Sequence, residues 1–326
     1  MSGPGVPVDA ESTERARPQR VLRSDVRVAR RRLAGRVRKT PVFHTSVDGP
    51  DGPVPVSLKL EFLQHGGTFK VRGALNALLA ADEGADHVVV ASGGNAGIAV
   101  ALAAAQLGKA CTVVVPESAP HTKVAAMWAH GAEVLWHGTS YSEAQRRALT
   151  LATERGAEHL HAYDMPAVVA GAGVIGLELE EQVRGRPPVL VAVGGGGLIA
   201  GLGAALGRRR QIIGIESEHT PVLSAALAAG APVDVSAQSQ VTELLCATRI
   251  GDIAFDIAQR QRMPALSVAD DAIAAARAYL WREFRVVVEL EGAAALAAVQ
   301  SGAYVPEPGV RPIVVLCGAN TELPVL

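Results

Sequence analysis

The stretch VAVGGGGLIAGL, residues 191–202, sets four consecutive glycines between two apolar runs. This order predicts a strand, a tight turn and a helix whose first N–H groups attract anions. Four glycines in succession cost backbone entropy on folding, so they favour a functional reason, the close approach of the backbone to a phosphate. Gly195, Gly197 and Ala200 also fit the G-x-G-x-x-A dinucleotide fingerprint. Glu216, at the end of the apolar run IIGIE, stands where such a site keeps its ribose-binding acid, so the stretch alone leaves the cofactor open.

On both sides of this stretch, apolar runs of strand length alternate with segments of helical periodicity. Strands separated by helices of ten or more residues indicate right-handed crossovers and mostly parallel sheets, and therefore an α/β fold. Strands are predicted at 54–63, 87–92, 110–116, 132–137, 188–194, 211–216 and 311–318, and helices at 24–37, 69–81, 94–108, 123–131, 140–156, 172–184, 198–207, 270–284 and 292–300.

These strands suffice for two sheets, so we expect two lobes. Residues 87–163 are a self-contained run of strand–helix units and are predicted to form a small domain. Residues 21–86 with 164–326 are predicted to form the large domain, and residues 1–20 a flexible tail rich in Pro, Ser, Gly and charge. The segment 232–264 is the least regular span.

Composition excludes several classes of function. Lys plus Arg number 31 and Asp plus Glu 32, so a net charge of −1 gives no electrostatic reason to expect nucleic acid. The cysteines, Cys111, Cys246 and Cys317, are far apart, which argues against disulfides and structural zinc. Nine histidines include no H-E-x-x-H, so no metal site is predicted. No apolar run suits a signal peptide or a membrane span, so we expect a soluble, cytoplasmic protein without a membrane partner.

Another chemically suggestive segment is GGTFKVRGA, residues 66–74, where a lysine follows a glycine-rich turn and begins a helix. A lysine in apolar surroundings can act as a nucleophile that forms a Schiff base. The alternative interpretation of Lys70 and Arg72 is that both are ordinary surface residues of a first helical turn.

Two further segments place polar groups at the ends of predicted strands. In VVVASGGNAGIA (88–99), Ser92, Asn95 and the backbone N–H groups could hold a carboxylate or a ring hydroxyl, or Asn95 could simply cap a helix. In VVLCGAN (314–320), Cys317 ends a buried strand at the edge where ligands bind in parallel sheets, although a lone cysteine there can also be an inert core residue.

Taken together in this order, the segments resemble the fold-type II pyridoxal-phosphate enzymes of the threonine/serine dehydratase and serine racemase family. LKLEFLQHGGTFKVRGALNAL is similar to the lysine motif of that family, ASGGNAG to its asparagine loop, VGGGGLIAG to its phosphate loop and VVLCGAN to its C-terminal ring-contacting segment. VVVELEGAAALAAV (286–299) resembles another family stretch. The resemblance spans about residues 20–322 and implies a two-lobed, tryptophan synthase β-like fold.

The resemblance also implies a role for each matching residue. Lys70 is implied to bind the cofactor aldehyde as a Schiff base and to move the Cα proton of the substrate. The further residues implied to bind pyridoxal 5′-phosphate are Phe69, Asn95, Gly194, Gly195, Gly196, Gly197, Leu198 and Cys317. Those implied to bind the substrate carboxylate are Ser92, Gly93, Gly94 and Asn95. The reaction implied is dehydration and deamination of a β-hydroxy amino acid such as L-threonine or L-serine by a homodimeric ammonia-lyase.

The chain departs from the family pattern at several positions. Gly93 stands where racemases of the family have the serine that serves the opposite face, which disfavours racemisation. Glu216 matches an acid of the family's cation site, but Val222 replaces its aspartate. Ala96 replaces the usual histidine, and Leu244, Leu245 and Cys246, in the span 241–251, stand where relatives have smaller or acidic residues, which leaves the preferred substrate open.

Other functions stay open at this point. Within pyridoxal-phosphate enzymes these are a serine racemase, or a β-eliminating or β-replacing enzyme that acts on a bulkier amino acid. Outside them are an NAD-dependent oxidoreductase, which rests on the fingerprint and Glu216, and a non-catalytic amino-acid sensor.

Overall fold

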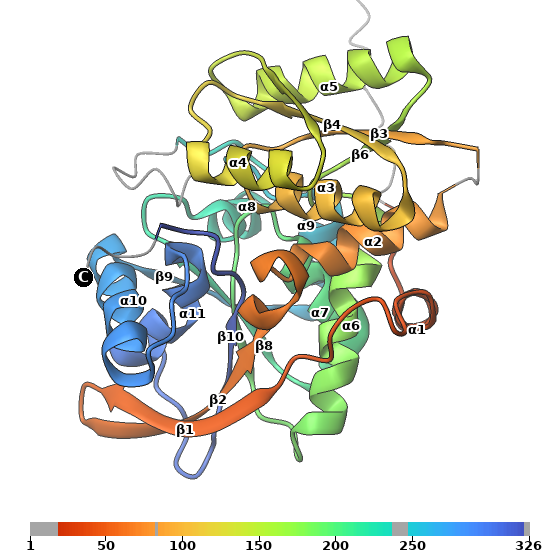
Figure 1. Cartoon of the computed structure of the whole chain (residues 1–326). Helices are drawn as coiled ribbons and strands as arrows, with labels where there is room; N and C mark the ends of the chain where they lie inside the picture. The colour runs from red at the N-terminus through yellow and green to blue at the C-terminus, as the bar shows by residue number, and fades with distance from the viewer. Residues whose placement is uncertain (1–18, 82–83, 237–246, 323–326) are drawn as a thin grey trace, which may run out of the picture.

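The computed structural model describes residues 19–81, 84–236 and 247–322, whose strands form two sheets (Figure 1). The six-stranded sheet has the order β1-β2-β10-β7-β8-β9 and the four-stranded sheet the order β5-β4-β3-β6. Every pairing is parallel except that of β1 with β2. The strands are β1 (Val42–Gly49), β2 (Gly52–Leu60), β3 (His87–Ala91), β4 (Ala110–Val115), β5 (Glu133–Trp136), β6 (Glu158–Leu160), β7 (Val189–Ala192), β8 (Ile212–Ser217), β9 (Ala265–Val268) and β10 (Ile313–Leu316).

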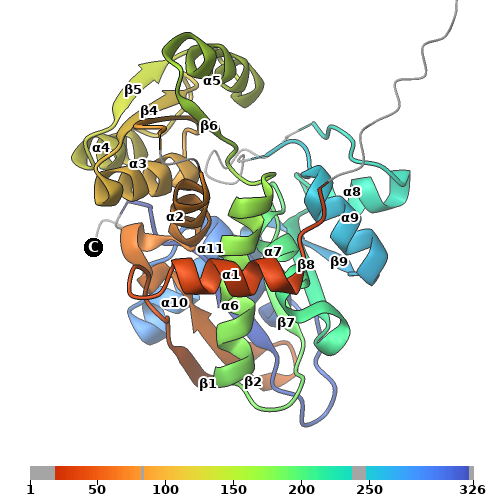
Figure 2. The ribbon, with the colours of Figure 1, turned by 90° about the vertical axis from the view of Figure 1, so that its right-hand side faces the viewer.

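Helices cover both faces of the six-stranded sheet. In Figure 2, α1 and α6 lie in front of this sheet, and α10 and α11 lie behind it. The helices are α1 (Arg23–Arg32), α2 (Lys70–Ala80), α3 (Asn95–Leu107), α4 (His121–Ala129), α5 (Tyr141–Arg155), α6 (Pro166–Gln182), α7 (Gly197–Leu206), α8 (Val222–Ala229), α9 (Asp252–Gln261), α10 (Asp270–Phe284) and α11 (Leu290–Gln300), with short 3-10 turns at Glu61–Leu63, His65–Gly67 and Gly207–Arg209. We call residues 87–160, with the four-stranded sheet and α3 to α5, the small lobe, and the rest of the described chain the large lobe.

The predicted α/β alternation is confirmed, and some helices begin and end at the capping residues and glycines that the sequence indicates. Helix α5 begins with a capping box formed by Ser140 and Glu143. Helices α3 and α5 end at Gly108 and Gly156, whose left-handed φ values of 67° and 59° only glycine adopts easily. Strands such as β4 and β10 are buried on both faces, which explains why they appear in the sequence as continuous apolar runs.

The structure differs from the prediction at several elements. Helix α6 begins at Pro166, six residues before the predicted start at 172. Gly171 and Gly173 weaken the helical pattern there, but they allow close packing: a Cβ at Gly171 would lie 2.4 Å from the carbonyl oxygen of Arg72. The span 232–264, described from the sequence as the least regular, contains α9. The elements β1, β6, α8 and β9 were not predicted either.

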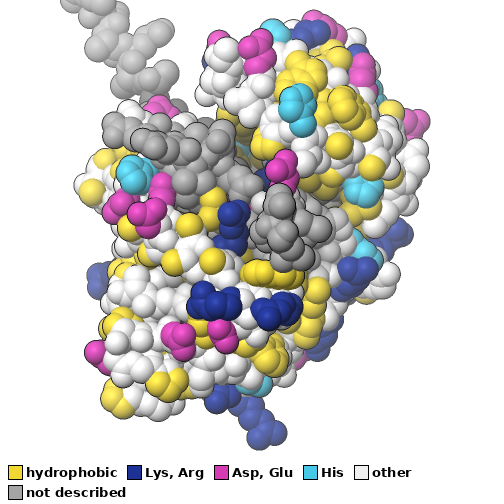
Figure 3. Space-filling view, turned by 60° about the vertical axis from the view of Figure 1, so that its left-hand side comes forward, with side chains coloured by type: hydrophobic (Ala, Val, Ile, Leu, Met, Phe, Trp, Pro, Cys, Tyr) yellow, Lys and Arg dark blue, Asp and Glu magenta, His cyan; other side chains and the backbone are white. Residues whose placement is uncertain are grey.

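Among the described residues, no helix has the length and apolar character that crossing a membrane requires. On the face that Figure 3 shows, acidic and basic side chains are interspersed among hydrophobic ones.

Candidate active site

A cavity of about 230 Å³ opens between the lobes, at the carboxyl ends of β3, β7 and β10. This is the edge at which parallel sheets bind ligands. All the residues predicted to act in the site line it, namely Phe69, Lys70, Ser92, Gly93, Gly94, Asn95, Gly194, Gly195, Gly196, Gly197, Leu198 and Cys317. The structure therefore brings the four separate sequence segments to one place, although it assigns none of them a ligand.

The glycine loop runs from the end of β7 to α7, which begins at Gly197. Gly194 has open space where a side chain would stand, whereas a Cβ at Gly195 would lie 2.4 Å from the ring of Tyr163. Gly196 has a left-handed φ of 89°, and a Cβ there would lie 2.5 Å from that of Ala254. The four glycines thus combine an open approach at Gly194 with tight packing at the next two positions.

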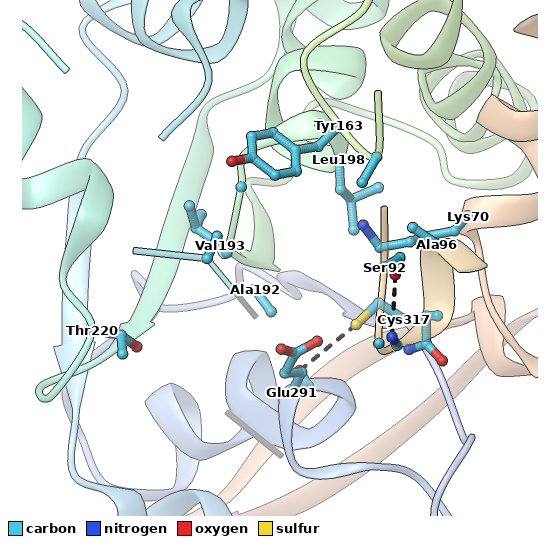
Figure 4. A pocket seen from close by; sticks show the side chains of 18 of the residues that line it. Lys70, Ser92, Ala96, Tyr163, Ala192, Val193, Leu198, Thr220, Glu291 and Cys317 are labelled. Atoms are coloured by element: carbon cyan, nitrogen blue, oxygen red, sulfur yellow. Dashed lines mark hydrogen bonds between the residues drawn. The ribbon is translucent and has the colours of Figure 1, made fainter. Parts of the chain in front are cut away.

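Lys70 is the first residue of α2, and its side chain extends into the cavity (Figure 4). The backbone before it is fixed to the end of β10, because the N–H of Phe69 donates to the carbonyl of Cys317 at 3.1 Å. The Nζ of Lys70 lies 5.5 Å from the centre of the Phe69 ring. This hydrogen bond therefore fixes the lysine segment next to the cysteine segment, although the two are far apart in the sequence.

The asparagine loop connects β3 to α3 and faces the same cavity. The Ser92 hydroxyl accepts from the N–H of Gly94 at 3.1 Å, and Asn95 is the first residue of α3. A Cβ at Gly93 would lie 2.8 Å from that of Ala119, so the loop leaves no room for a side chain there.

Cys317 is buried at the floor of the cavity, where its thiol donates to the carbonyl of Glu291 at 3.7 Å (Figure 4). Burial raises the pKa of the Cys317 thiol well above its usual value, and the carboxylates of Glu289 and Glu291 raise it further. The thiol is therefore neutral at physiological pH. The Glu291 side chain also lines the cavity, a position that the sequence analysis did not assign.

Tyr163 is another lining residue that the sequence analysis missed. His161 orients its turn, because His161 Nδ1 accepts from the N–H of Asp164 at 2.9 Å. Burial lowers the pKa of His161 to about 4, which keeps the ring neutral and able to accept. Asp164 in turn accepts from the N–H groups of Asp252 and Ile253, both at 3.0 Å, and so caps α9. No sequence motif indicates this arrangement.

The second missed group is a buried ion pair between the lobes. Lys123, from α4 of the small lobe, lines the cavity and donates to Glu289 Oε2 at 3.1 Å. Glu289 also accepts from Asn95 Nδ2. The only sequence signal for it was the family-like stretch 286–299, which carried no assigned role.

Glu216 lies in the large lobe as the N-terminal cap of α8. Its carboxylate accepts from the N–H groups of Leu223 and Ser224 and from the Ser224 hydroxyl. In the described part of the chain, no three His, Cys, Asp or Glu side chains are grouped as metal ligands. The predicted departures Leu244, Leu245 and Cys246 lie outside the described residues.

Comparison with known proteins shows the family of this chain and its cofactor class. A family model described as pyridoxal-phosphate dependent enzyme matches residues 33–318. The chain is 33% identical over 304 residues to the L-threonine ammonia-lyase of Thermotoga maritima, which covers 92% of this chain and 75% of that protein. It is also 33% identical over 300 residues to the phenylserine dehydratase of Ralstonia pickettii, with 90% of this chain and 91% of that protein covered.

Among solved structures, maize serine racemase superimposes with a TM-score of 0.85 at 27% identity, over 94% of this chain and 95% of that one. The names of these relatives thus describe different activities. The predicted fold class and the predicted cofactor, pyridoxal phosphate, are confirmed. The chain belongs to the family of pyridoxal-phosphate-dependent enzymes.

Proposed function

We propose that this enzyme eliminates water from a β-hydroxy amino acid such as L-threonine or L-serine. The unsaturated product takes up water again and loses ammonia, so the net products are a 2-oxo acid and ammonia. The observation that carries the proposal is the cavity that joins Lys70, the glycine loop and the asparagine loop. Similarity to an L-threonine ammonia-lyase and a phenylserine dehydratase supports the reaction class. The substrates named for these two relatives differ in the size of the substituent on the β-carbon, so this size is the open question for this enzyme.

The residues present fit the cofactor. The first N–H groups of α7 have no acceptor within the helix, and Gly194 leaves open space beside them, as a phosphate requires. We propose that Gly194, Gly195, Gly196, Gly197 and Leu198 hold that phosphate. The neutral Cys317 thiol suits an uncharged ring nitrogen, because it offers a hydrogen bond without a negative charge.

Lys70 is proposed to hold the cofactor through its Nζ and then to take the Cα proton of the substrate. When bound, pyridoxal phosphate supplies the electron sink that allows this proton and then the β-hydroxyl to leave. Phe69 packs beside the lysine, and Asn95 is proposed to donate to the ring hydroxyl. The loop Ser92, Gly93, Gly94 and Asn95 is proposed to bind the substrate carboxylate at the start of α3.

Crowding at Gly93 favours elimination over racemisation. A racemase needs a second acid or base on the face of Cα opposite the lysine, and the asparagine loop is the segment implied to provide it. Because Ala119 and Pro116 leave no room for a side chain at Gly93, this loop can present only backbone there.

The experiment measures release of 2-oxo acid and ammonia from L-threonine, L-serine and 3-phenylserine by the purified holoenzyme, together with formation of D-amino acids. Lys70→Ala is expected to abolish turnover and borohydride-stable labelling by the cofactor, whereas Lys39→Ala, which removes an exposed lysine paired with Glu181, is the matched control. An active Lys70→Ala protein with an unchanged cofactor spectrum would overturn the proposal, and rapid racemisation without elimination would replace it.

We also propose that the two lobes are the small domain, 87–163, and the large domain, 21–86 with 164–326, and that the enzyme is a cytoplasmic homodimer. The two sheets, one from residues 87–160, support the division. Light scattering of the purified holoenzyme tests the dimer, and a mass of 33.7 kDa for the particle would contradict it.

A further inference from the structure

The carboxylate of Glu289 is buried between the lobes at the edge of the cavity, with 2% of the residue exposed. Its Oε1 accepts from Asn95 Nδ2, and its Oε2 accepts from Lys123 Nζ at 3.1 Å. Asn95 and Lys123 both belong to the small lobe, whereas Glu289 directly precedes α11 of the large lobe. One large-lobe side chain therefore binds two donors of the opposite lobe.

These contacts decide the orientation of the Asn95 amide. An ionised carboxylate can only accept hydrogen bonds, so it selects the NH2 side of the amide. On the other side, Asn95 Oδ1 accepts from Asn320 Nδ2 at 2.8 Å, and that same Nδ2 donates to the carbonyl of Gly66 at 2.8 Å. A flipped Asn95 amide would lose both bonds, so the second hydrogen of its Nδ2 stays available to an oxygen in the cavity.

The backbone around this cluster is shaped to admit the carboxylate. A Cβ at Gly318 would lie 2.0 Å from Glu289 Oε1, and one at Gly67 would lie 2.9 Å from Asn320 Oδ1. The N–H of Glu289 donates to the carbonyl of Gly318 at 3.1 Å, which fixes the start of α11 against the end of β10. Glycine at these two positions is what lets the side chains meet.

We propose that Glu289 is a positioning residue, which holds the Asn95 amide with an N–H toward the cavity and, through Lys123, sets the small lobe against the large lobe around the cofactor. The inference rests on the proposed function, because it takes Asn95 as the donor to the ring hydroxyl. A donor that is oriented before its acceptor arrives needs no reorganisation when the acceptor binds, so fixing Asn95 favours cofactor binding as well as catalysis.

Two double variants separate positioning from charge. Glu289→Gln with Lys123→Met removes both buried charges but keeps an amide oxygen for Asn95. Glu289→Met with Lys123→Met removes the charges and that acceptor as well, at similar side-chain volume. The apo-protein of each is titrated with pyridoxal phosphate, and the dissociation constant and the absorption maximum of the bound cofactor are measured beside those of the wild-type protein.

The variant that lacks the acceptor is expected to bind the cofactor about tenfold more weakly than the variant that keeps it, the effect of one hydrogen bond of about 1.4 kcal/mol, and to shift the absorption maximum. Equal affinity and equal spectra in the two variants would overturn the inference. If instead the wild-type protein binds no pyridoxal phosphate, the proposed function itself fails.

A measurement on the wild-type protein covers the case in which either double variant does not fold. A crystal structure of the holoenzyme is expected to keep Asn95 Nδ2 on Glu289 and its second hydrogen toward the cofactor. A holoenzyme in which Glu289 makes no contact with Asn95 would overturn the inference regardless of the variants.

Discussion

The large lobe encloses a cluster of four charged side chains, whereas the boundary between the lobes encloses the pair Lys123–Glu289. The four-residue cluster consists of Lys59, Glu61, Arg72 and Glu178. Arg72 donates to Glu61 Oε2 at 2.8 Å and to Glu178 Oε1 at 2.6 Å, and Lys59 donates to Glu178 Oε2 at 2.6 Å. The cluster is balanced, with two charges of each sign, and none of its members lines the cavity.

Burial has opposite outcomes for the carboxylates of the two groups. It would raise the pKa of Glu61, but the Arg72 guanidinium and the Lys59 ammonium outweigh it, so the pKa of Glu61 is below its usual value. For Glu289, one ammonium does not compensate, and burial raises the pKa to about 7. A buried carboxylate with a bidentate guanidinium stays ionised. A buried carboxylate with a single ammonium, beside the cavity, is left close to a change of charge.

The largest expected effect is on stability, from Arg72→Met. This change leaves two buried carboxylates with only Lys59, so the free energy of unfolding should fall by about 3–5 kcal/mol. Urea denaturation of the apo-protein measures it. Arg147→Met, which breaks the exposed pair Arg147–Glu154, is the matched control and should change stability by less than about 1 kcal/mol. Equal losses in the two variants would contradict the structural role of the four-residue cluster.

Two glycine substitutions sharpen the comparison. In Gly171→Ala the new Cβ would lie 2.4 Å from the Arg72 carbonyl, so helices α2 and α6 must separate and the free energy of unfolding should fall by about 1–3 kcal/mol. In Gly318→Ala the new Cβ displaces the Glu289 carboxylate, a flexible group, so stability should fall less while affinity for pyridoxal phosphate falls about tenfold.

The control for both is Gly84→Ala, where a Cβ meets nothing within 4 Å. Unfolding curves and cofactor titrations are compared for the three variants. If Gly171→Ala weakens cofactor binding more than Gly318→Ala does, the assignment of a structural role to Gly171 and a cofactor-binding role to Gly318 is contradicted.

Features that depend on local sequence could be predicted, whereas features that depend on contacts between distant segments could not. Most strands and helices of the described chain follow from apolar periodicity, but β1, β6, β9, α8 and α9 were not predicted. The predicted cavity-lining residues came from segments with local backbone chemistry, such as the four glycines, and from the family resemblance, which assigned no role to Tyr163, Lys123 or Glu291. The start of α6 was missed because Gly171 and Gly173 lower the local helix propensity. Glycine is needed at these positions for close packing against α2 and α7, and helix propensity contains no information about such contacts.

The buried charge pairs could not be predicted from the sequence for a related reason. Glu289 lies 166 residues from Lys123 and 194 residues from Asn95 along the chain. A Glu in an apolar stretch gives no sign of which donors the fold will bring to it. Arg72 was open to interpretation as an ordinary surface residue, yet it is fully buried, because its four-residue cluster is assembled from distant segments.

The effect that separates the two groups most cleanly is on the pH dependence of stability. Glu289 has a folded-state pKa of about 7, above the ordinary 4.5, so the folded protein holds an extra proton between these values and stability falls as pH rises through that window. Glu61 has a lowered pKa, so its contribution is present above 4.5 and is lost as the pH falls below that value. The groups that face Glu289 are Lys123, Glu291 and the Cys317 thiol, whose pKa is too high for it to ionise in this window.

Unfolding of the apo-protein is therefore measured from pH 3.5 to 8.5 for the wild type, Glu289→Gln and Glu61→Gln. Glu289→Gln should flatten the decline between about pH 4.5 and 7 and leave the acid limb in place, because the amide that replaces the carboxyl group does not titrate. Glu61→Gln, although less stable throughout, should flatten the acid limb alone. If Glu289→Gln leaves the neutral limb unchanged, Glu289 is already ionised at pH 5, and the single ammonium of Lys123 stabilises its charge as fully as the guanidinium of Arg72 stabilises that of Glu61.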